Sequence, residues 1–168
     1  MKRNAFIPLV ILLLLLNACH HESTTDCPGT LVATWKENGN PMTSNVVLYV
    51  HGTTMFNLTF TACVTDKNDR TCSLALLPYP PVPGTYPLKY PANSGLPWNG
   101  YGQGVYTVET SGDFTTDTSS HIGSITIATV DTINKRLSGS FAFDAVSTTG
   151  SGSVSITDGQ LINVKYSN

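Results

Sequence analysis

The sequence predicts an all-β fold, an antiparallel β-sandwich or partly closed barrel of about eight to ten strands. Short segments rich in threonine, valine, isoleucine, tyrosine and phenylalanine are separated by turn dipeptides such as Asn38-Gly39 and Asp158-Gly159, and this composition is typical of strands and tight turns. Several segments alternate apolar and polar residues, whereas none after residue 29 carries the 3.6-residue apolar stripe of a helix. Many short strands at close intervals indicate a sandwich or barrel.

The first 18 residues are expected to be a signal peptide. A basic start, Met1 to Arg3, precedes an uncharged apolar run from Phe6 to Leu16, which is too short to span about 30 Å of hydrocarbon comfortably. The next residues, Leu16-Asn17-Ala18-Cys19, resemble the lipobox of bacterial lipoproteins, with Asn17 where a small residue is more usual. The resemblance implies that Cys19 becomes the first residue and carries a diacylglycerol and an acyl chain such as palmitate, which together anchor a protein stably. An ordinary secretory signal with a chance cysteine is the alternative.

A polar tether is expected to link this lipid anchor to a single domain. Residues 19–29 lack apolar periodicity and cannot bury a face. The adjacent His20 and His21 have no third ligand near them, so no metal site is predicted. The remaining residues, 30–168, suffice for one hydrophobic core and are few for two. We therefore expect a domain held on a membrane of the bacterial cell envelope, with the outer membrane as the expected site and its periplasmic or surface exposure left open.

Two hairpins are expected to open the domain. The first joins Thr30–Glu37 to Val46–His51 through Asn38-Gly39, which suits positive φ. The second joins Met55–Cys63 to Cys72–Leu77. In its first strand, apolar residues alternate with polar ones, as in a strand with one buried face.

The second hairpin also predicts a disulfide. It places Cys63 opposite or nearly opposite Cys72, and an exported protein meets an oxidising compartment in which such a pair can be bridged. Two reduced cysteines are the alternative. Cys27 is then left over, either as a free thiol on the tether or paired elsewhere. No histidine or carboxylate lies at ligand spacing around these cysteines, so zinc is not expected.

A proline-rich segment interrupts the strands. Seven of the ten prolines lie between Pro78 and Pro97, and a central strand excludes proline because it lacks the amide donor. This segment is predicted to be a long surface connection with one short edge strand, Thr85–Lys89. Aromatic rings on such loops can bind sugars or peptides, which makes candidate ligand-contacting residues of Trp98, Tyr101, Tyr79, Tyr86 and Tyr90. The alternative is that these rings pack the loop onto the sheet.

The C-terminal part is expected to contain the remaining strands. Strands are predicted at Gly104–Thr110 and Ile122–Val130, followed by a turn at residues 131–135. A further strand follows, with Gly139 at a bulge or close backbone approach and Phe141 and Phe143 in the core. A closing hairpin is predicted around Asp158-Gly159, with apolar residues at alternate positions on either side, namely Val154, Ile156, Ile162, Val164 and Tyr166.

These C-terminal segments carry a family resemblance. Residues 123–127, 134–143 and 156–161, together with Ala33-Thr34-Trp35, resemble a family of Bacteroidetes lipoproteins of unknown function, with Leu161 where a phenylalanine is usual. The resemblance implies an exported, lipid-anchored, β-sandwich-like domain with no established catalytic residues. Asp131-Thr132-Ile133 also resembles the O-glycosylation sequon of that phylum, which makes Thr132 a candidate glycosylation site. A plain turn is the alternative.

The remaining features favour binding over chemistry. The net charge is −2 and only 12% of residues are charged, so the basic surface needed for a nucleic-acid partner is absent. No HExxH, GxSxG, CxxC or P-loop pattern occurs, and we expect no catalytic residue, cofactor or metal. The sequence favours a non-enzymatic module that binds a glycan, peptide or protein through residues 78–106. The alternatives are a structural or assembly component of an envelope complex and a hydrolase whose carboxylates are assembled by the fold.

Overall fold

The computed structural model describes residues 29–51, 56–63, 69–76, 80–89, 102–117 and 120–166. Within these ranges the fold is all-β, as predicted, and contains strands without any helix. The strands are β1 (Ala33–Glu37), β2 (Asn40–Ser44), β3 (Val47–His51), β4 (Phe56–Thr61), β5 (Arg70–Leu76), β6 (Gly84–Leu88), β7 (Gln103–Val108), β8 (Gly112–Thr115), β9 (Gly123–Asp131), β10 (Arg136–Ser147) and β11 (Ser153–Lys165).

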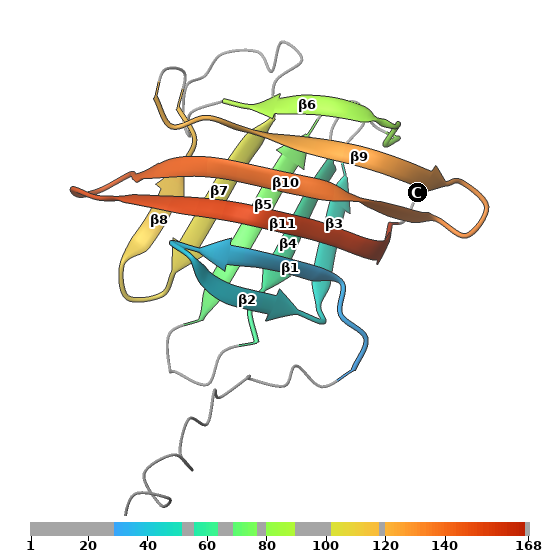
Figure 1. The fold of residues 1–168 in the computed structure, drawn as a ribbon, viewed down its shortest axis with the longest axis horizontal. Helices are drawn as coiled ribbons and strands as arrows, with labels where there is room; N and C mark the ends of the chain where they lie inside the picture. Colours follow the sequence, from blue (N-terminus) through green and yellow to red (C-terminus); the bar gives the residue numbers. More distant parts are fainter. Residues whose placement is uncertain are drawn as a thin grey trace, which may run out of the picture.

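The eleven strands form one sheet that folds back on itself into a nearly closed, barrel-like structure (Figure 1). One layer has the order β2-β1-β11-β10-β9-β6, and the other has the order β8-β7-β5-β4-β3. The two layers cross at a steep angle in Figure 1. The long strand β10 joins them, because Val146 and Ser147 at its end pair with Thr115 and Phe114 of β8. All pairings between these strands are antiparallel. Successive side chains of a strand lie on opposite faces, so alternate side chains point into the space between the layers.

That space holds a single apolar core. Trp35 of β1, Phe56 and Phe60 of β4, Tyr106 of β7 and Ile125 of β9 are almost completely buried there. The rings of Phe60 and Phe141 stack across it, with centroids 6.3 Å apart and planes at 6°. Because β4 and β10 belong to different layers, this contact ties the layers together. The alternation predicted for β4 is confirmed by its burial pattern.

The Asn38-Gly39 turn is present, but the strand that follows it differs from the expected one. Asn38 and Gly39 have φ of 48° and 87°, as this turn requires, and they connect β1 to β2. The predicted pairing of β1 with Val46–His51 is wrong, since β3 pairs with β4. The β2 segment was not predicted because it is short and polar and contains Pro41, which only an edge strand tolerates.

The predicted closing hairpin is also wrong, because residues on both sides of Asp158-Gly159 belong to one 13-residue strand, β11. Asp158 and Asn163 adopt positive φ of 53° and 56°, and the register against β10 shifts near each of them. Both positions are therefore bulges. A bulge uses the same left-handed residues as a turn but bends the strand instead of reversing it, so the two are hard to distinguish in the sequence.

The second hairpin is confirmed, but the disulfide predicted within it is wrong. Cys72 is a free thiol, buried completely in the core, and this burial raises the pKa of the thiol. It pairs in register with Phe60, whose side chain points inward. Cys63 follows the buried Ala62 beyond the end of β4 and is only half-buried. Alternation along the strand therefore directs the two cysteines to opposite faces of the sheet.

Candidate functional site

Most of the predicted ligand-contacting residues, Trp98, Tyr101, Tyr79 and Tyr90, lie outside the described residues, as does Cys19. Tyr86 lies on β6, the predicted edge strand, which pairs with β9 at the end of its layer. Its hydroxyl donates a hydrogen bond of 2.9 Å to the carbonyl of Val82, its ring packs against the core, and partial burial raises the pKa of its phenol. Tyr86 thus helps to hold residues 80–89 against the sheet.

Thr132, the candidate glycosylation site, lies in the exposed turn between β9 and β10. The Asp131 carboxylate organises this turn by accepting hydrogen bonds from the backbone amides of Asn134 (2.8 Å) and Ile133 (2.9 Å) and from Nδ2 of Asn134 (2.7 Å). These bonds, above all those from Asn134, lower the pKa of Asp131. Thr132 is thus in an accessible position, and its glycosylation stays a prediction.

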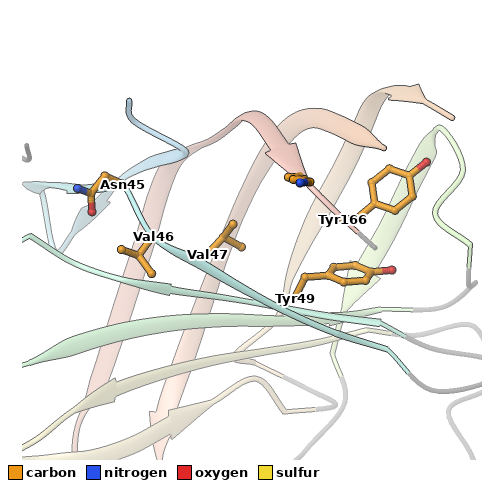
Figure 2. A pocket seen from close by; sticks show the side chains of 6 residues that line it. Asn45, Val46, Val47, Tyr49 and Tyr166 are labelled. Atoms are coloured by element: carbon orange, nitrogen blue, oxygen red, sulfur yellow. The ribbon is translucent and has the colours of Figure 1, made fainter. Parts of the chain in front are cut away.

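A groove lies at the corner where β3 approaches the C-terminal end of β11 (Figure 2). It has a volume of about 450 Å³ and is lined by Asn45, Val46, Val47, Tyr49, Lys165 and Tyr166. β3 is the last strand of its layer in the described part of the sheet. The groove therefore occupies the corner at which the barrel is not closed by strand pairing in that part of the chain.

Aromatic rings form one wall of the groove. The rings of Tyr49 and Tyr166 lie 6.0 Å apart at 49° and extend to the same side in Figure 2. Tyr49 also packs against Phe56 and His51, at 5.9 Å and 5.8 Å. Such tilted contacts at 4.5–7 Å are favourable, so the rings hold one another in place. The ring of Tyr49 is therefore packed against the rings of His51, Phe56 and Tyr166.

Beside the groove, the outer face of β3 and the residue before it carry exposed apolar side chains. Leu48 is 60% exposed, and Val46 and Val50 are each more than half exposed. They alternate along the strand and so share one face. On the same face of β4, the residues paired with Leu48 and Val50 are Thr59 and Asn57. The apolar stripe is therefore confined to the strand that ends the sheet, where natural proteins usually place charge or proline instead.

The charge near the groove is positive. Lys165 lines it, and Nζ of Lys135 lies 6.0 Å from the ring centroid of Tyr166. No acidic residue occurs among its described lining residues. The groove thus combines an apolar strip, an aromatic wall and basic groups. The sequence does not predict this groove, although residues 46–50 are apolar at successive positions. A strand that is apolar on both faces is typical of one that is covered on both sides.

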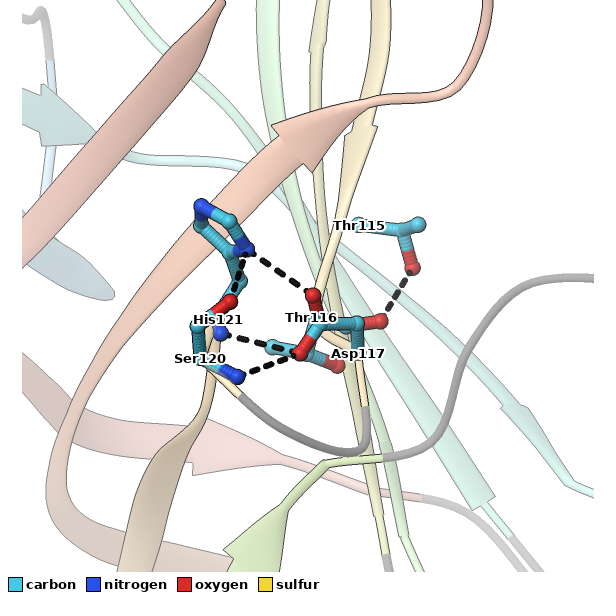
Figure 3. Close-up of polar contacts among 5 residues, drawn as sticks. All are labelled: Thr115, Thr116, Asp117, Ser120 and His121. Carbon is cyan, nitrogen blue, oxygen red and sulfur yellow. Dashed lines mark hydrogen bonds and ion pairs between the residues drawn. The ribbon is translucent and has the colours of Figure 1, made fainter.

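A second, smaller cavity of about 290 Å³ lies beside His121 and is also lined by Asn38, Asp144 and Ser155. Nδ1 of His121 lies 2.9 Å from Oδ2 of Asp117 and 3.1 Å from Oγ of Ser120 (Figure 3). In a catalytic triad the serine and the carboxylate contact opposite ring nitrogens, whereas here both contact Nδ1. Asp117 also accepts hydrogen bonds of 2.9 Å from the backbone amides of Ser120 and His121. The cluster therefore holds Ser120 and His121, which precede β9, against Asp117, which follows β8.

The described residues contain no group of three or more histidine, cysteine, aspartate or glutamate side chains that could hold a metal ion. A membrane-spanning helix is likewise absent from the part of the chain that the structure describes.

The fold and the groove thus define an all-β, barrel-like domain with a surface groove at its open corner. The chain belongs to the family described as "Domain of unknown function (DUF6252)", which matches residues 67–165. The match contains β5 to β11, and β1 to β4 precede it. No curated protein and no solved structure matches the chain.

Proposed function

We propose that this chain is a non-enzymatic, lipid-anchored binding module of the bacterial cell envelope, and that it binds an extended segment of another exported protein along β3. The observation that carries the proposal is the exposed apolar stripe of Val46, Leu48 and Val50 beside the groove. A strand added next to β3 would place alternate side chains against this stripe. Its other side chains would face the groove.

The proposal moves the binding surface away from residues 78–106, for which the described Tyr86 supports a packing role. It also favours a peptide over a glycan. Sugars stack on open aromatic faces, whereas Tyr49 has neighbours at 5.8–6.0 Å on several sides. A strip of aliphatic side chains on an edge strand suits the alternate side chains of an extended peptide.

The chemistry of the partner segment follows from the lining. It should alternate apolar residues with others and carry an aspartate or glutamate where it passes Lys165, since an opposite charge in this position favours the correct register. The lipobox-like Cys19 supports attachment to a membrane, and the family resemblance of the sequence supports an envelope location.

Selection from a displayed library of peptides from exported proteins, against the immobilised domain, tests this function. We expect the selected peptides to share alternating apolar residues and an acidic residue. Leu48→Asp should weaken their binding at least tenfold, because a charge would be buried next to apolar side chains. Ile133→Asp is the matched control, since Ile133 is 89% exposed in the turn between β9 and β10 and should leave affinity unchanged.

Three results would contradict the proposal. These are equal loss of affinity in both variants, selected peptides without an apolar alternation, and binding of envelope polysaccharide that Leu48→Asp abolishes.

A further inference from the structure

The two cysteines in the described part of the chain differ in state. Cys72 is a free thiol, and Cys63 is disulfide-bonded. The chain has four cysteines, and the other two, Cys19 and Cys27, both precede Gly29. The question is therefore which of these two bonds Cys63 within the chain. We propose that Cys27 and Cys63 form a disulfide that ties the tether to the domain.

Contacts among described residues bring the chain next to Cys27 close to Cys63. A methyl group placed on the Cα of Gly29 would lie 3.7 Å from Nδ2 of Asn45. Oδ1 of the same Asn45 lies 3.6 Å from Sγ of Cys63. Only the side chain of Asn45 therefore lies between Gly29 and the sulfur of Cys63. Cys27 is two residues earlier, within about 7 Å of Gly29 along the chain, and disulfides join Cα atoms about 4.4–6.8 Å apart.

The position of Cys63 is fixed well enough for such a bridge. Its backbone amide donates a hydrogen bond of 2.8 Å to the carbonyl of Thr43 in β2, and that of the preceding Ala62 donates one of 2.8 Å to Arg70 in β5. Asn45 follows β2 directly. The end of β4 and the segment between β2 and β3 are therefore held together, and the chain enters the domain beside them.

Cys19 is the less suitable partner for two reasons. It lies ten residues before Gly29, so no described contact places it near Cys63. Its thiol is also the atom that the proposed lipid would occupy as a thioether, which cannot form a disulfide. This second reason rests on the proposed function, whereas the proximity of Gly29, Asn45 and Cys63 does not.

The reaction joins the Cys27 and Cys63 sulfur atoms as their two S–H bonds break. Two electrons and two protons pass to an oxidised dithiol carrier or a small-molecule disulfide, which becomes reduced to thiols. The product closes a loop that contains β1 to β4. The bridge would also hold Cys27 near Asn45, a residue that lines the groove.

Peptide mapping of the full-length mature protein tests the bridge. Free thiols are alkylated in the native, unreduced protein before digestion with trypsin, which cleaves after Lys36, Lys67 and Arg70 and so separates Cys27, Cys63 and Cys72. Digestion after Glu22 separates Cys19 from Cys27. We expect the peptides of Cys27 and Cys63 to be joined until reduction, and Cys72 to be alkylated only after unfolding. In Cys27→Ser, Cys63 should become alkylated, and the control Cys72→Ala should keep the link.

Alkylation of Cys63 in native protein that has been exposed to oxidised glutathione, or a link from Cys63 to Cys19 or Cys72, would overturn the proposal. If the protein is recovered reduced because it is not exported, oxidised glutathione added to the pure protein should still produce the Cys27–Cys63 link. Failure to do so overturns the bridge, whereas a link formed only in this way counts against the envelope location alone.

Discussion

Asp131 shows how a single exposed residue can fix a turn. Its carboxylate accepts three hydrogen bonds from Ile133 and Asn134, and these lower its pKa. A lowered pKa means that the ionised form stabilises the fold above the pKa of the unfolded chain, near 4. This stabilisation is lost as the pH falls further, through the lowered pKa of the folded protein.

Asp131→Asn should therefore lower stability near neutral pH, and the difference from the wild type should vanish well below about pH 4. Urea unfolding followed at both pH values measures this. A difference that persists unchanged in acid would mean that the charge of Asp131 is not the cause.

Gly139 is a residue at which a single methyl group should matter. A Cβ at this position would collide with the carbonyl oxygen of Thr126 on β9, and backbone cannot move aside as a side chain can. We expect Gly139→Ala to lower the free energy of unfolding by about 1–3 kcal/mol. In Gly150→Ala the new methyl would lie at an ordinary 3.6 Å from Oγ of Ser147, so denaturant titration should give a change within about 0.5 kcal/mol. Similar losses in both variants would contradict the close approach.

At the scale of elements, the sequence predicted those strands whose pattern is local. The alternation from Phe56 to Ala62 and the turn at residues 131–135 were sufficient to locate the strands beside them. The sequence also predicts a bulge or a close backbone approach at Gly139. The approach to Thr126 is confirmed, and the register of β10 against β9 shifts at the same place. In each case the signal lies within a few consecutive residues.

The elements that the sequence did not predict depend on distant partners. β8 has four residues and exists because β7 and β10 pair with it. β11 is continuous because its pairing with β10 accommodates two bulges, and its pairing with β1 also shifts at the first of them. The groove was missed for the same reason, since Tyr49 and Tyr166 meet only when the sheet curls. The predicted disulfide between Cys63 and Cys72 is wrong because a hairpin brings two residues close together but does not determine on which face of the sheet each side chain lies.

The two layers are also joined by charge. Nε of Arg70 on β5 lies 3.0 Å from Oε2 of Glu37 on β1, and the two side chains are only 17% and 15% exposed. Arg70→Met should leave Glu37 largely buried without its cation and should lower the free energy of unfolding by about 3 kcal/mol. Lys36 and Asp158 are 2.9 Å apart but 49% and 68% exposed, so Lys36→Met should cost at most about 0.5 kcal/mol. If Arg70→Met and Lys36→Met lower the free energy of urea unfolding equally, burial does not determine how much each ion pair contributes.

At the scale of the whole molecule, the proposed lipid on Cys19 determines where the protein is found. Cys19→Ala should move the protein from the membrane fraction to the soluble exported fraction, because the acyl chains supply the membrane affinity. Fractionation with immunoblotting measures the change, and Cys72→Ala serves as the control that should remain in the membrane. Retention of Cys19→Ala in the membrane would contradict the anchor.

The central claim, that the open corner along β3 is the binding surface, is tested most directly by hydrogen–deuterium exchange of the mature protein with and without a selected peptide. We expect slower exchange at residues 46–50 and 162–166, where an added strand would cover the backbone and the groove. Protection of residues 80–89 and 102–108 instead, with β3 unchanged, would contradict the claim and return the binding surface to the proline-rich segment.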